Sequence, residues 1–297
     1  MTQIPFEGIE EMQLGHSTYN TSLYSLRDGG LLSVELDTAK VWNCDTGQEK
    51  KTLKYHSNYI TSGVCQLENG LVAATSEDNT IILWDVDHQE SDKQKMVLKG
   101  HTSVLCVCAL SNGLLASGYS EGTTIVWNSE TGERILTLRR QHYGLFSIIQ
   151  LHNGLLATGS YDKTIQLWDL QNVQSVRTLK GHYDCVNCMC QLQDGTLVSG
   201  SWDEIKMWDV RSEKCLKTLQ GHTCQVNSLC QLHDGRLLST GSDEKVLIWN
   251  VQTGACEMTL QNRGCRVCQL LDGRVAISMR NDFTVSMFDA FTIKLLR

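Results

Sequence analysis

The chain has 297 residues, of which 41% are hydrophobic and 20% are charged, which is enough to bury a large core and argues against a disordered chain. Twenty-six Lys and Arg against 33 Asp and Glu leave a net charge of -7, which disfavours nucleic acid and anionic membranes as partners. No stretch of 18 apolar residues and no secretory leader is found, so we expect no membrane association.

Two sequence markers recur along the chain with the same period. The first is Asn-Gly or Asp-Gly, with its glycine at 29, 70, 113, 154, 195, 235 and 273. The second is an aromatic residue followed by Asp or Asn, at Trp42, Trp84, Trp127, Trp168, Trp208, Trp249 and Phe288. Both markers return every 38 to 43 residues, so the chain contains seven repeats.

Each repeat reads as four β-strands. The Asn-Gly or Asp-Gly lies between two apolar runs, as in residues 64–75 and 189–200, which predicts a β-hairpin with a type I′ turn and positive φ at both central residues. A third run ends at the aromatic residue, as in 164–170, and a fourth follows, as in 134–138. No segment has a helical period. Seven units of four antiparallel strands predict an all-β, seven-bladed β-propeller.

The repeats also predict the boundaries of a single domain over residues 1–297. The blades are expected at about 14–48, 55–98, 100–138, 141–179, 181–219, 221–260 and 262–297. Either residues 8–14 or residues 291–297 can supply the last strand of the final blade, and we favour 8–14.

A second set of residues resembles the WD-repeat family. Blades of that family carry Gly-His before the first strand, Ser or Thr in the second, Asp in the next turn and Trp-Asp after the third. Blade five matches with Gly181, His182, Ser199, Asp203 and Trp208. Blade four matches with His142, Thr158, Asp162 and Trp168. The resemblance implies that each set forms a hydrogen-bonded relay inside its blade.

Several blades depart from this pattern, and in blade four Gln141 replaces the glycine. Blade two has Ala74 where the others have Ser or Thr, and blade three has Glu121 in place of the turn Asp. Blade seven lacks the histidine and has Phe288 for Trp. We therefore expect blade seven to lack the relay and to be the least stable blade.

The recurring Ser, His and Asp could also suggest a hydrolase triad. An enzyme does not need five copies of a nucleophile, and no G-x-S-x-G motif is present, so the structural interpretation is favoured and no enzymatic activity is expected. Two C-x-x-C spacings, 185–188 and 265–268, could suggest zinc. Four cysteines, however, stand in a repeated Cys-Gln-Leu at 65, 190, 230 and 268, which favours core packing. We predict no metal and no cofactor.

The thirteen cysteines also bear on the compartment. Without a leader they favour free thiols in a reducing environment, which predicts the cytoplasm or the nucleus.

Candidate binding residues follow from the resemblance. It implies that the residues three and five after the relay histidine, and the one before the turn Asp, face the central channel. Tyr161 and Trp202 stand before the turn Asp, and an aromatic pair without a core role is a binding hypothesis. The further candidates are Val104, Leu145, Cys185, Asn187, Tyr19 and Tyr59. Nearby acidic residues suggest a partner peptide with a basic or aromatic side chain.

The predicted function is that of a non-catalytic scaffold or adaptor, a monomeric ring that binds other proteins or short peptides within a larger complex. A substrate-recognition subunit of a ubiquitin ligase or of another regulatory complex is the alternative, and it would need a separate ligase chain. An enzyme would need a polar or metal-binding cluster on the channel face, and none is evident in the sequence. A role with RNA is disfavoured because no basic stripe with interleaved aromatics is present.

Overall fold

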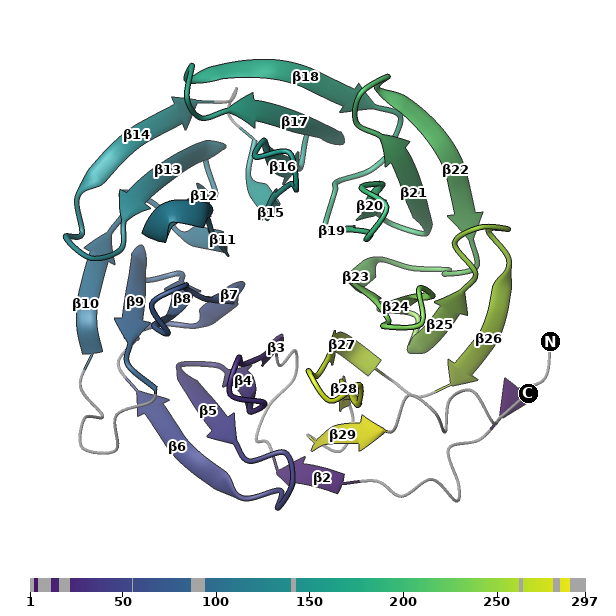
Figure 1. The fold of residues 1–297 in the computed structure, drawn as a ribbon, viewed down its shortest axis with the longest axis horizontal. Helices are drawn as coiled ribbons and strands as arrows, with labels where there is room; N and C mark the ends of the chain where they lie inside the picture. The colour runs from purple at the N-terminus through teal and green to yellow at the C-terminus, as the bar shows by residue number, and fades with distance from the viewer. Residues whose placement is uncertain are drawn as a thin grey trace. The chain divides into compact units, whose positions relative to one another are not determined.

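The computed structural model describes residues 3–4, 12–15, 22–54, 56–86, 94–139, 143–261, 264–279 and 284–288. In these residues the regular secondary structure is β-strand, apart from one 3-10 helix, η1 (Ser111–Gly113), and there is no α-helix. The strands make seven sheets, and each sheet contains four antiparallel strands that form one blade (Figure 1). The predicted fold class, a seven-bladed β-propeller, is confirmed.

The bounds of the strands follow the repeats. Blade one contains β3 (Ser22–Ser25), β4 (Leu31–Glu35), β5 (Thr38–Trp42) and β6 (Glu49–Lys54). Blade two contains β7 (Ile60–Gln66), β8 (Val72–Ser76), β9 (Thr80–Trp84) and β10 (Gln94–Lys99). Blade three contains β11 (Val104–Ala109), β12 (Leu114–Tyr119), β13 (Thr123–Asn128) and β14 (Arg134–Arg139). Blade four contains β15 (Leu145–Gln150), β16 (Leu156–Ser160), β17 (Thr164–Asp169) and β18 (Gln174–Lys180).

The remaining blades include both strands of the N-terminal segment. Blade five contains β19 (Cys188–Gln191), β20 (Leu197–Gly200), β21 (Glu204–Asp209) and β22 (Lys214–Gln220). Blade six contains β23 (Val226–Gln231), β24 (Leu237–Gly241), β25 (Lys245–Trp249) and β26 (Cys256–Gln261), with β1 (Gln3–Ile4) added. Blade seven contains β27 (Gly264–Gln269), β28 (Val275–Met279), β29 (Thr284–Phe288) and β2 (Met12–Gly15).

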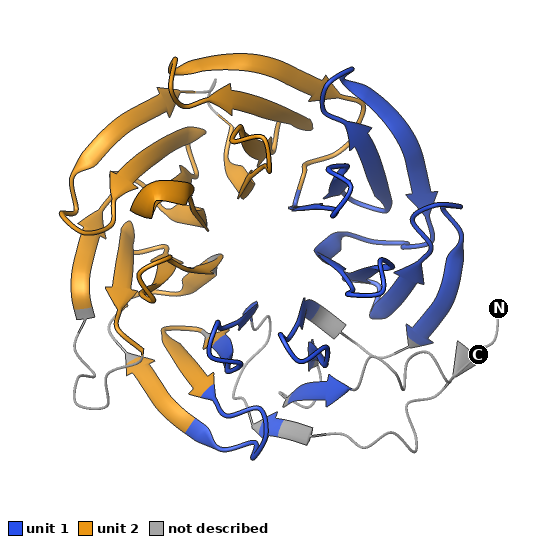
Figure 2. Ribbon diagram, in the orientation of Figure 1, with its two compact units in different colours: residues 1–33, 42–49, 187–297 blue, residues 34–41, 50–186 orange. Residues whose placement is uncertain are grey.

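The chain divides into two compact units (Figure 2). Unit 1 comprises residues 1–33, 42–49 and 187–297 and holds blades five, six and seven. Unit 2 comprises residues 34–41 and 50–186 and holds blades two, three and four. The strands of blade one are shared between the two units.

Within each unit, the core lies between neighbouring blades. The second strand of a blade is buried on both faces, as β16 is along its whole length, whereas Leu179 is the one buried residue of the outer strand β18. In unit 2, Trp168 of blade four shares one apolar cluster with Leu138 and Cys106 of blade three. Burial on both faces explains why the second strands read as continuous apolar runs rather than as alternating ones.

The hairpins correct one prediction. Every Asn-Gly or Asp-Gly glycine has a positive φ, for example 86° at Gly70, but a positive φ at the residue before it occurs only at Asn112, with 68°. In blade two, Gly70 N donates to the Leu67 carbonyl at 3.0 Å and Leu67 N donates to the Leu71 carbonyl at 2.7 Å. This is a three-residue loop, a type I turn followed by a left-handed glycine. The type I′ prediction is therefore wrong at every hairpin except the one at Asn112.

The glutamine of the Cys-Gln-Leu repeat links neighbouring hairpins. In unit 1, Gln231 Nε2 donates to the Gly235 carbonyl of its own hairpin at 3.1 Å. Its Oε1 accepts the backbone N–H of Gln193, in the preceding blade, at 2.8 Å. Gln269 repeats both bonds one blade later, at 2.9 and 2.8 Å. The repeated glutamine is thus a structural residue that satisfies backbone groups of two blades at once.

The N-terminal segment contributes to two blades of unit 1. Strand β2 pairs antiparallel with β29, with Leu14 opposite Val285, so it is the fourth strand of blade seven. Residues 8–11 and 291–297, which also bear on the expected closure, lie outside the described residues. Strand β1 pairs parallel with the outer strand β26, with Ile4 opposite Leu260, and gives blade six a fifth strand.

Candidate functional site

Tyr161 lies in the turn between β16 and β17 of blade four, where hydrogen bonds fix its backbone and that of the next residue. Its N–H donates to the Gly144 carbonyl at 3.0 Å. The next residue, Asp162, donates its N–H to Ser160 Oγ at 3.2 Å and accepts Thr164 N–H at 3.0 Å. The tyrosine side chain nevertheless has 57% of its surface exposed. A rigid backbone therefore presents a large aromatic ring to solvent.

Two further aromatic residues of blade four belong to the same surface. Phe146 contacts Tyr161, with ring centroids 6.4 Å apart and planes tilted by 53°. Tyr143, whose carbonyl accepts Ser160 Oγ at 3.5 Å, has 47% of its side chain exposed. We call Tyr143, Phe146 and Tyr161 the blade-four aromatic surface. Only Tyr161 was predicted from the sequence, because Tyr143 and Phe146 lie in the loop and strand that precede its turn.

Tyr59 lies in the loop before β7 of blade two, at the position that Gly144 holds in blade four. Its carbonyl accepts the Glu77 N–H at 3.0 Å and Ser76 Oγ at 2.9 Å, while its side chain is 55% exposed. Tyr19 lies outside the described residues.

Trp202 is the exposed aromatic residue of blade five, in unit 1. Its turn is one residue shorter than that of blade four, and Ser201 N donates directly to the Glu204 carbonyl at 3.0 Å. The Glu204 carboxylate is buried and pairs with Lys206 Nζ at 3.0 Å. Trp202 remains 44% exposed, so the shorter turn also presents its aromatic side chain.

Cys185 and Asn187, two further candidates, are half-buried. The backbone N–H of Asn187 donates to the Gly200 carbonyl at 2.9 Å, and that of Cys185 donates to Asp184 Oδ1 at 2.7 Å. Burial and the neighbouring Asp184 carboxylate raise the pKa of the Cys185 thiol to about 11. The thiol is therefore protonated at neutral pH and is not an activated nucleophile.

The structure corrects the prediction for Val104 and Leu145. They begin β11 and β15, and only 0% and 1% of their surfaces are exposed, so their side chains cannot contact a partner. In blade six the equivalent first-strand residue, Val226, follows the histidine by four residues, whereas in blades three and four the interval is three. The residue three positions after the histidine is therefore a buried core residue in blades three and four.

The relay is complete in blade six. Trp249 Nε1 donates to Ser239 Oγ at 2.8 Å, Ser239 Oγ lies 2.8 Å from His222 Nε2, and His222 Nδ1 lies 2.9 Å from Asp243 Oδ1. Because Trp can only donate and a carboxylate can only accept, the hydroxyl donates to Nε2 and Nδ1–H donates to Asp243. Burial would raise the pKa of Asp243, but the bonds from His222 and from backbone N–H groups lower it.

This geometry argues against the hydrolase interpretation. The Ser239 hydroxyl is occupied on both sides by the indole and the imidazole, and the serine has no exposed surface. A substrate cannot reach it without opening the blade. The relay therefore acts as an internal brace that satisfies buried polar groups.

Blades four and five contain parts of the same relay. Trp168 Nε1 donates to Thr158 Oγ1 at 3.0 Å, and Trp208 Nε1 donates to Ser199 Oγ at 2.8 Å. His182 is buried, with 7% exposed, whereas His142 lies outside the described residues.

The relay of blade two is interrupted at Ala74. His56 Nδ1 lies 3.0 Å from Asp78 Oδ2, but His56 Nε2 and Trp84 Nε1 are both buried without a hydrogen-bond partner in the described residues. The two rings meet edge to face, with centroids 5.7 Å apart. Ala74 lacks the hydroxyl that Ser or Thr supplies at this position in other blades, which explains why both nitrogen atoms have no partner.

Blade three replaces the histidine with a tyrosine. Trp127 Nε1 donates to Ser117 Oγ at 2.8 Å, and the buried Tyr119 hydroxyl lies 3.3 Å from the same oxygen. His101 stacks on the Tyr119 ring and pairs with Glu121 at the surface, where 41% of the histidine side chain is exposed. The His-to-Trp spacing did not predict that Tyr119 replaces His101, because the spacing of residues in the sequence does not determine which ring is buried in the blade.

The described residues offer no metal centre. In them, no group of three His, Cys, Asp or Glu side chains is arranged to hold a metal ion. Of the cysteines in the Cys-Gln-Leu repeat, Cys65 is buried and the other three are half-buried. Burial raises the pKa of Cys65, Cys190, Cys230 and Cys268. In the same part of the chain, no helix has the length and apolar character needed to cross a membrane.

Comparisons with known proteins agree with this architecture. The model of the family described as "WD domain, G-beta repeat" matches residues 47–85, 92–128, 133–169, 173–209 and 213–250, which together exceed half of the chain. The chain belongs to the WD-repeat family. WD-repeat propellers generally mediate interactions between proteins.

Two individual matches support the assignment. The crystal structure of the WD40 β-propeller domain of Doa1 superposes with a TM-score of 0.83 and 23% identity, and the match covers 96% of this chain and 98% of that one. An uncharacterized WD repeat-containing protein of Schizosaccharomyces pombe is 37% identical over 65 residues, which are 22% of this chain. The match spans only 17% of that protein's length.

Proposed function

We propose that this WD-repeat protein is a non-catalytic scaffold that binds peptides of partner proteins through exposed aromatic residues. The observation that carries the proposal is Tyr161, which combines a hydrogen-bonded backbone with a side chain that is 57% exposed. A rigid aromatic side chain loses little conformational entropy on binding and can bury a large area, which makes it an effective anchor. Tyr143 and Phe146 extend that surface.

The chemistry of the surface supports binding rather than catalysis. Tyrosine and tryptophan rings attract cations as well as apolar groups, which suits a basic or aromatic side chain of a partner peptide. Trp202 in unit 1 offers the same chemistry and is proposed as a second contact. The protonated Cys185 thiol and the enclosed Ser239 hydroxyl supply no nucleophile.

The test compares the proteins captured from native lysate by the wild type, Tyr161→Ala, Trp202→Ala and the double variant. Leu271→Ala is the control, because Leu271 is 61% exposed but lies in the loop after β27. We expect partners that are lost with the aromatic variants and kept by the control. Each such partner should then bind the purified wild type at least about tenfold more tightly than the Tyr161→Ala variant, because an anchor residue contributes about 1.4 kcal/mol or more. Identical captures by all variants would refute the proposal.

A further inference from the structure

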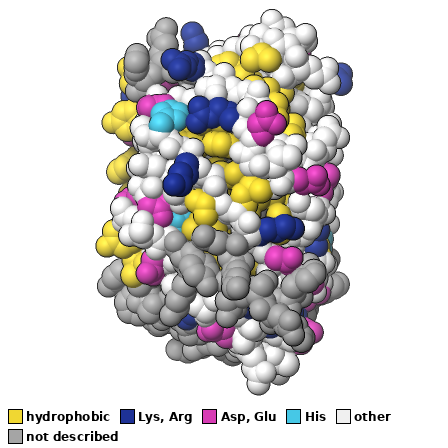
Figure 3. Space-filling view, turned by 90° about the vertical axis from the view of Figure 1, so that its left-hand side faces the viewer, with side chains coloured by type: hydrophobic (Ala, Val, Ile, Leu, Met, Phe, Trp, Pro, Cys, Tyr) yellow, Lys and Arg dark blue, Asp and Glu magenta, His cyan; other side chains and the backbone are white. Residues whose placement is uncertain are grey.

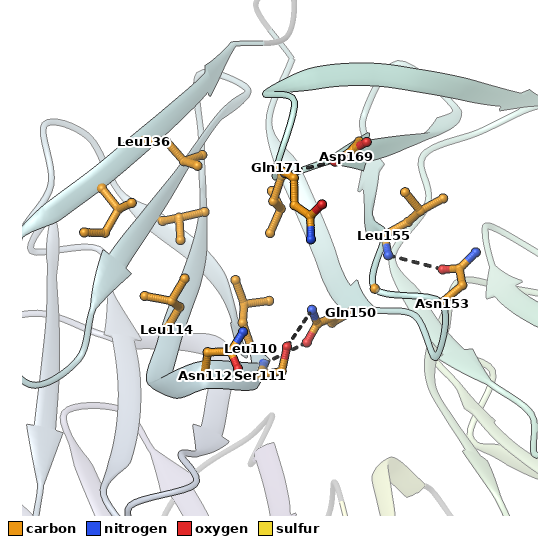
Figure 4. A pocket seen from close by; sticks show the side chains of 14 residues that line it. Leu110, Ser111, Asn112, Leu114, Leu136, Gln150, Asn153, Leu155, Asp169 and Gln171 are labelled. Carbon is orange, nitrogen blue, oxygen red and sulfur yellow. Dashed lines mark hydrogen bonds between the residues drawn. The ribbon is translucent and has the colours of Figure 1, made fainter.

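A pocket of about 430 Å³ lies between the sheets of blades three and four, inside unit 2 (Figure 4). Aliphatic side chains form its floor: Leu110, Leu114, Val126, Leu136, Leu155 and Leu170. The polar lining consists mostly of uncharged amides, among them Gln150 and Gln171. The one carboxylate, Asp169, already accepts hydrogen bonds from the backbone N–H groups of Gln171 and Asn172, at 2.9 and 3.2 Å.

Leu136 lies two residues before the buried leucine of its outer strand, a position that is lysine in blades one and five, arginine in blade four and methionine in blades two and six. The two lysines are Lys51 and Lys217. Lys51 Nζ donates to the Asp85 carbonyl of the next blade at 3.3 Å. Lys217 Nζ likewise donates to the carbonyls of residues 251 and 252 of the next blade. A leucine cannot make this bridge, so the gap before the turn of blade four stays open and apolar.

The glutamine of blade four also departs from the repeat. In blade two, Gln66 Nε2 donates to the Gly70 carbonyl of its own hairpin at 3.1 Å. Gln150 instead directs Nε2 toward Ser111 Oγ, at 3.3 Å, across the pocket (Figure 4). Gly154, a residue that lines the pocket, therefore receives no hydrogen bond on its carbonyl from Gln150, unlike Gly70 from Gln66. A backbone N–H of a ligand could supply that hydrogen bond.

The outer edge beside the pocket is exposed and apolar. Ile135 lines the pocket with 47% of its surface exposed, and Val173, in the turn that leads from β17 to β18, is 52% exposed. Apolar side chains lie among charged ones on the side that carries β10 and β14 (Figure 3). Strand β14 is the edge strand of its sheet, so one row of its main-chain groups is available for pairing.

Another blade of this chain shows that an additional strand can pair with an outer strand. Strand β1 pairs with β26, the corresponding outer strand of blade six, and it does so as an extended, parallel segment. We infer that the pocket receives the aliphatic side chain of an uncharged, extended segment of a partner protein, whose main chain pairs with β14. This is a second binding surface, separate from the blade-four aromatic surface.

The test uses the methyl-labelled 297-residue chain and a capped heptapeptide, acetyl-Thr-Gln-Thr-Leu-Thr-Gln-Thr-amide, with versions that carry Ala or Asp at the centre. We expect the leucine peptide to shift the methyl signals of Leu110, Leu136 and Leu155. It should bind about tenfold more tightly than the alanine peptide, which is the effect of burying an aliphatic side chain. The aspartate peptide should not bind. Equal binding of all three peptides, or shifts elsewhere, would overturn the inference.

A pair of reciprocal variants provides the controls. In Leu136→Lys, the new ammonium group should donate to a backbone carbonyl in the turn of blade four, as Lys51 and Lys217 do in the blades that follow theirs. This should close the pocket and reduce peptide affinity at least tenfold without unfolding the protein. Lys217→Leu should open an equivalent pocket between blades five and six and add a second set of methyl shifts. Tyr161→Ala should leave peptide binding unchanged, which separates this inference from the proposed function. Unaltered binding by Leu136→Lys would refute it.

Discussion

Arg274 of blade seven donates Nη2 to Asp45 Oδ1 of blade one at 2.8 Å, although 229 residues separate them in the chain. The same guanidinium donates Nη1 to the Cys44 carbonyl and pairs with Asp272 Oδ2 at 2.6 Å. Within unit 1 it therefore ties the β27–β28 hairpin to the turn that follows β5.

The two partners of this contact should differ in importance. We expect Arg274→Ala to lower the free energy of unfolding by about 1–2 kcal/mol, because it also removes the bond to the Cys44 carbonyl. Asp45→Ala should cost less than about 0.5 kcal/mol, since the Asp45 side chain is 87% exposed and solvent screens the pair. Urea unfolding of both variants checks this, and equal losses would contradict it.

Ala74→Ser should stabilise the protein. The new hydroxyl would accept from Trp84 Nε1 and donate to His56 Nε2, the two buried atoms that lack partners. We expect a gain of about 1 kcal/mol in the free energy of unfolding. Ala73→Ser is the matched control, because it adds the same hydroxyl to the neighbouring buried residue of β8 and should destabilise. A loss of stability in Ala74→Ser as large as in the control would rule out the repair.

His222 of blade six and His101 of blade three should contribute unequally to stability. His222→Ala leaves Asp243 and Ser239 buried without their partner, and we expect it to cost about 2–4 kcal/mol. His101→Ala should cost less than about 0.5 kcal/mol, because the imidazole is at the surface and Tyr119 occupies the interior position. Thermal and urea unfolding measure both. Similar losses would mean that His101 belongs to the interior relay after all.

Stability should fall on mild acidification through His56. Burial lowers the pKa of His56 below its ordinary 6.5, although Asp78 opposes the shift. The unfolded chain therefore takes up this proton first, so the stability contributed by neutral His56 is complete above pH 6.5 and is lost as the pH falls from there through the lowered pKa of the folded state.

Urea unfolding at pH 7.5, 6.5 and 5.5 tests this prediction. The slope contributed by one such group is at most about 1.4 kcal/mol per pH unit. His56→Gln should show a shallower dependence than the wild type over this range, whatever its absolute stability. The Asp78 contribution is lost only at lower pH, because its pKa is already lowered from 3.8. Parallel slopes for the two proteins would contradict the assignment to His56.

Val173→Gly should relieve a strained turn. Val173 has a φ of 51°, which is unfavourable for a β-branched residue, whereas the equivalent turn of blade three has Gly132 with a φ of 74°. We expect the variant to gain about 0.5–1 kcal/mol in the free energy of unfolding. Val176→Gly, in the following strand, is the control and should destabilise. A destabilised Val173→Gly would show that contacts of the valine outweigh its strain.

Local patterns in the sequence were sufficient for the architecture. The period of the Asn/Asp-Gly hairpins and of the Trp-Asp pairs predicts seven blades, because a turn and its flanking strands depend mainly on residues close in the chain. The same information predicted that Tyr161 and Trp202 would be exposed, since each lies in a tight turn. It failed on the turn type, because the length of the loop depends on which strand residues pair.

The positions of side chains in the assembled sheets were not predictable in this way. Val104 and Leu145 became core residues because their strands begin one residue earlier relative to the histidine than in blade six. Tyr119 entered the relay in place of His101 because of how two rings pack, which spacing does not encode.

The sequence by itself therefore determined the repeat, the strand order and the turns that carry exposed aromatics. Only the tertiary structure decided which ring enters a relay, that Leu136 leaves a pocket open, and that Arg274 meets Asp45. The physical reason is that hairpins form from neighbouring residues, whereas these three features depend on contacts between blades or between strands, where residues distant in the chain compete for the same space and the same hydrogen-bonding groups.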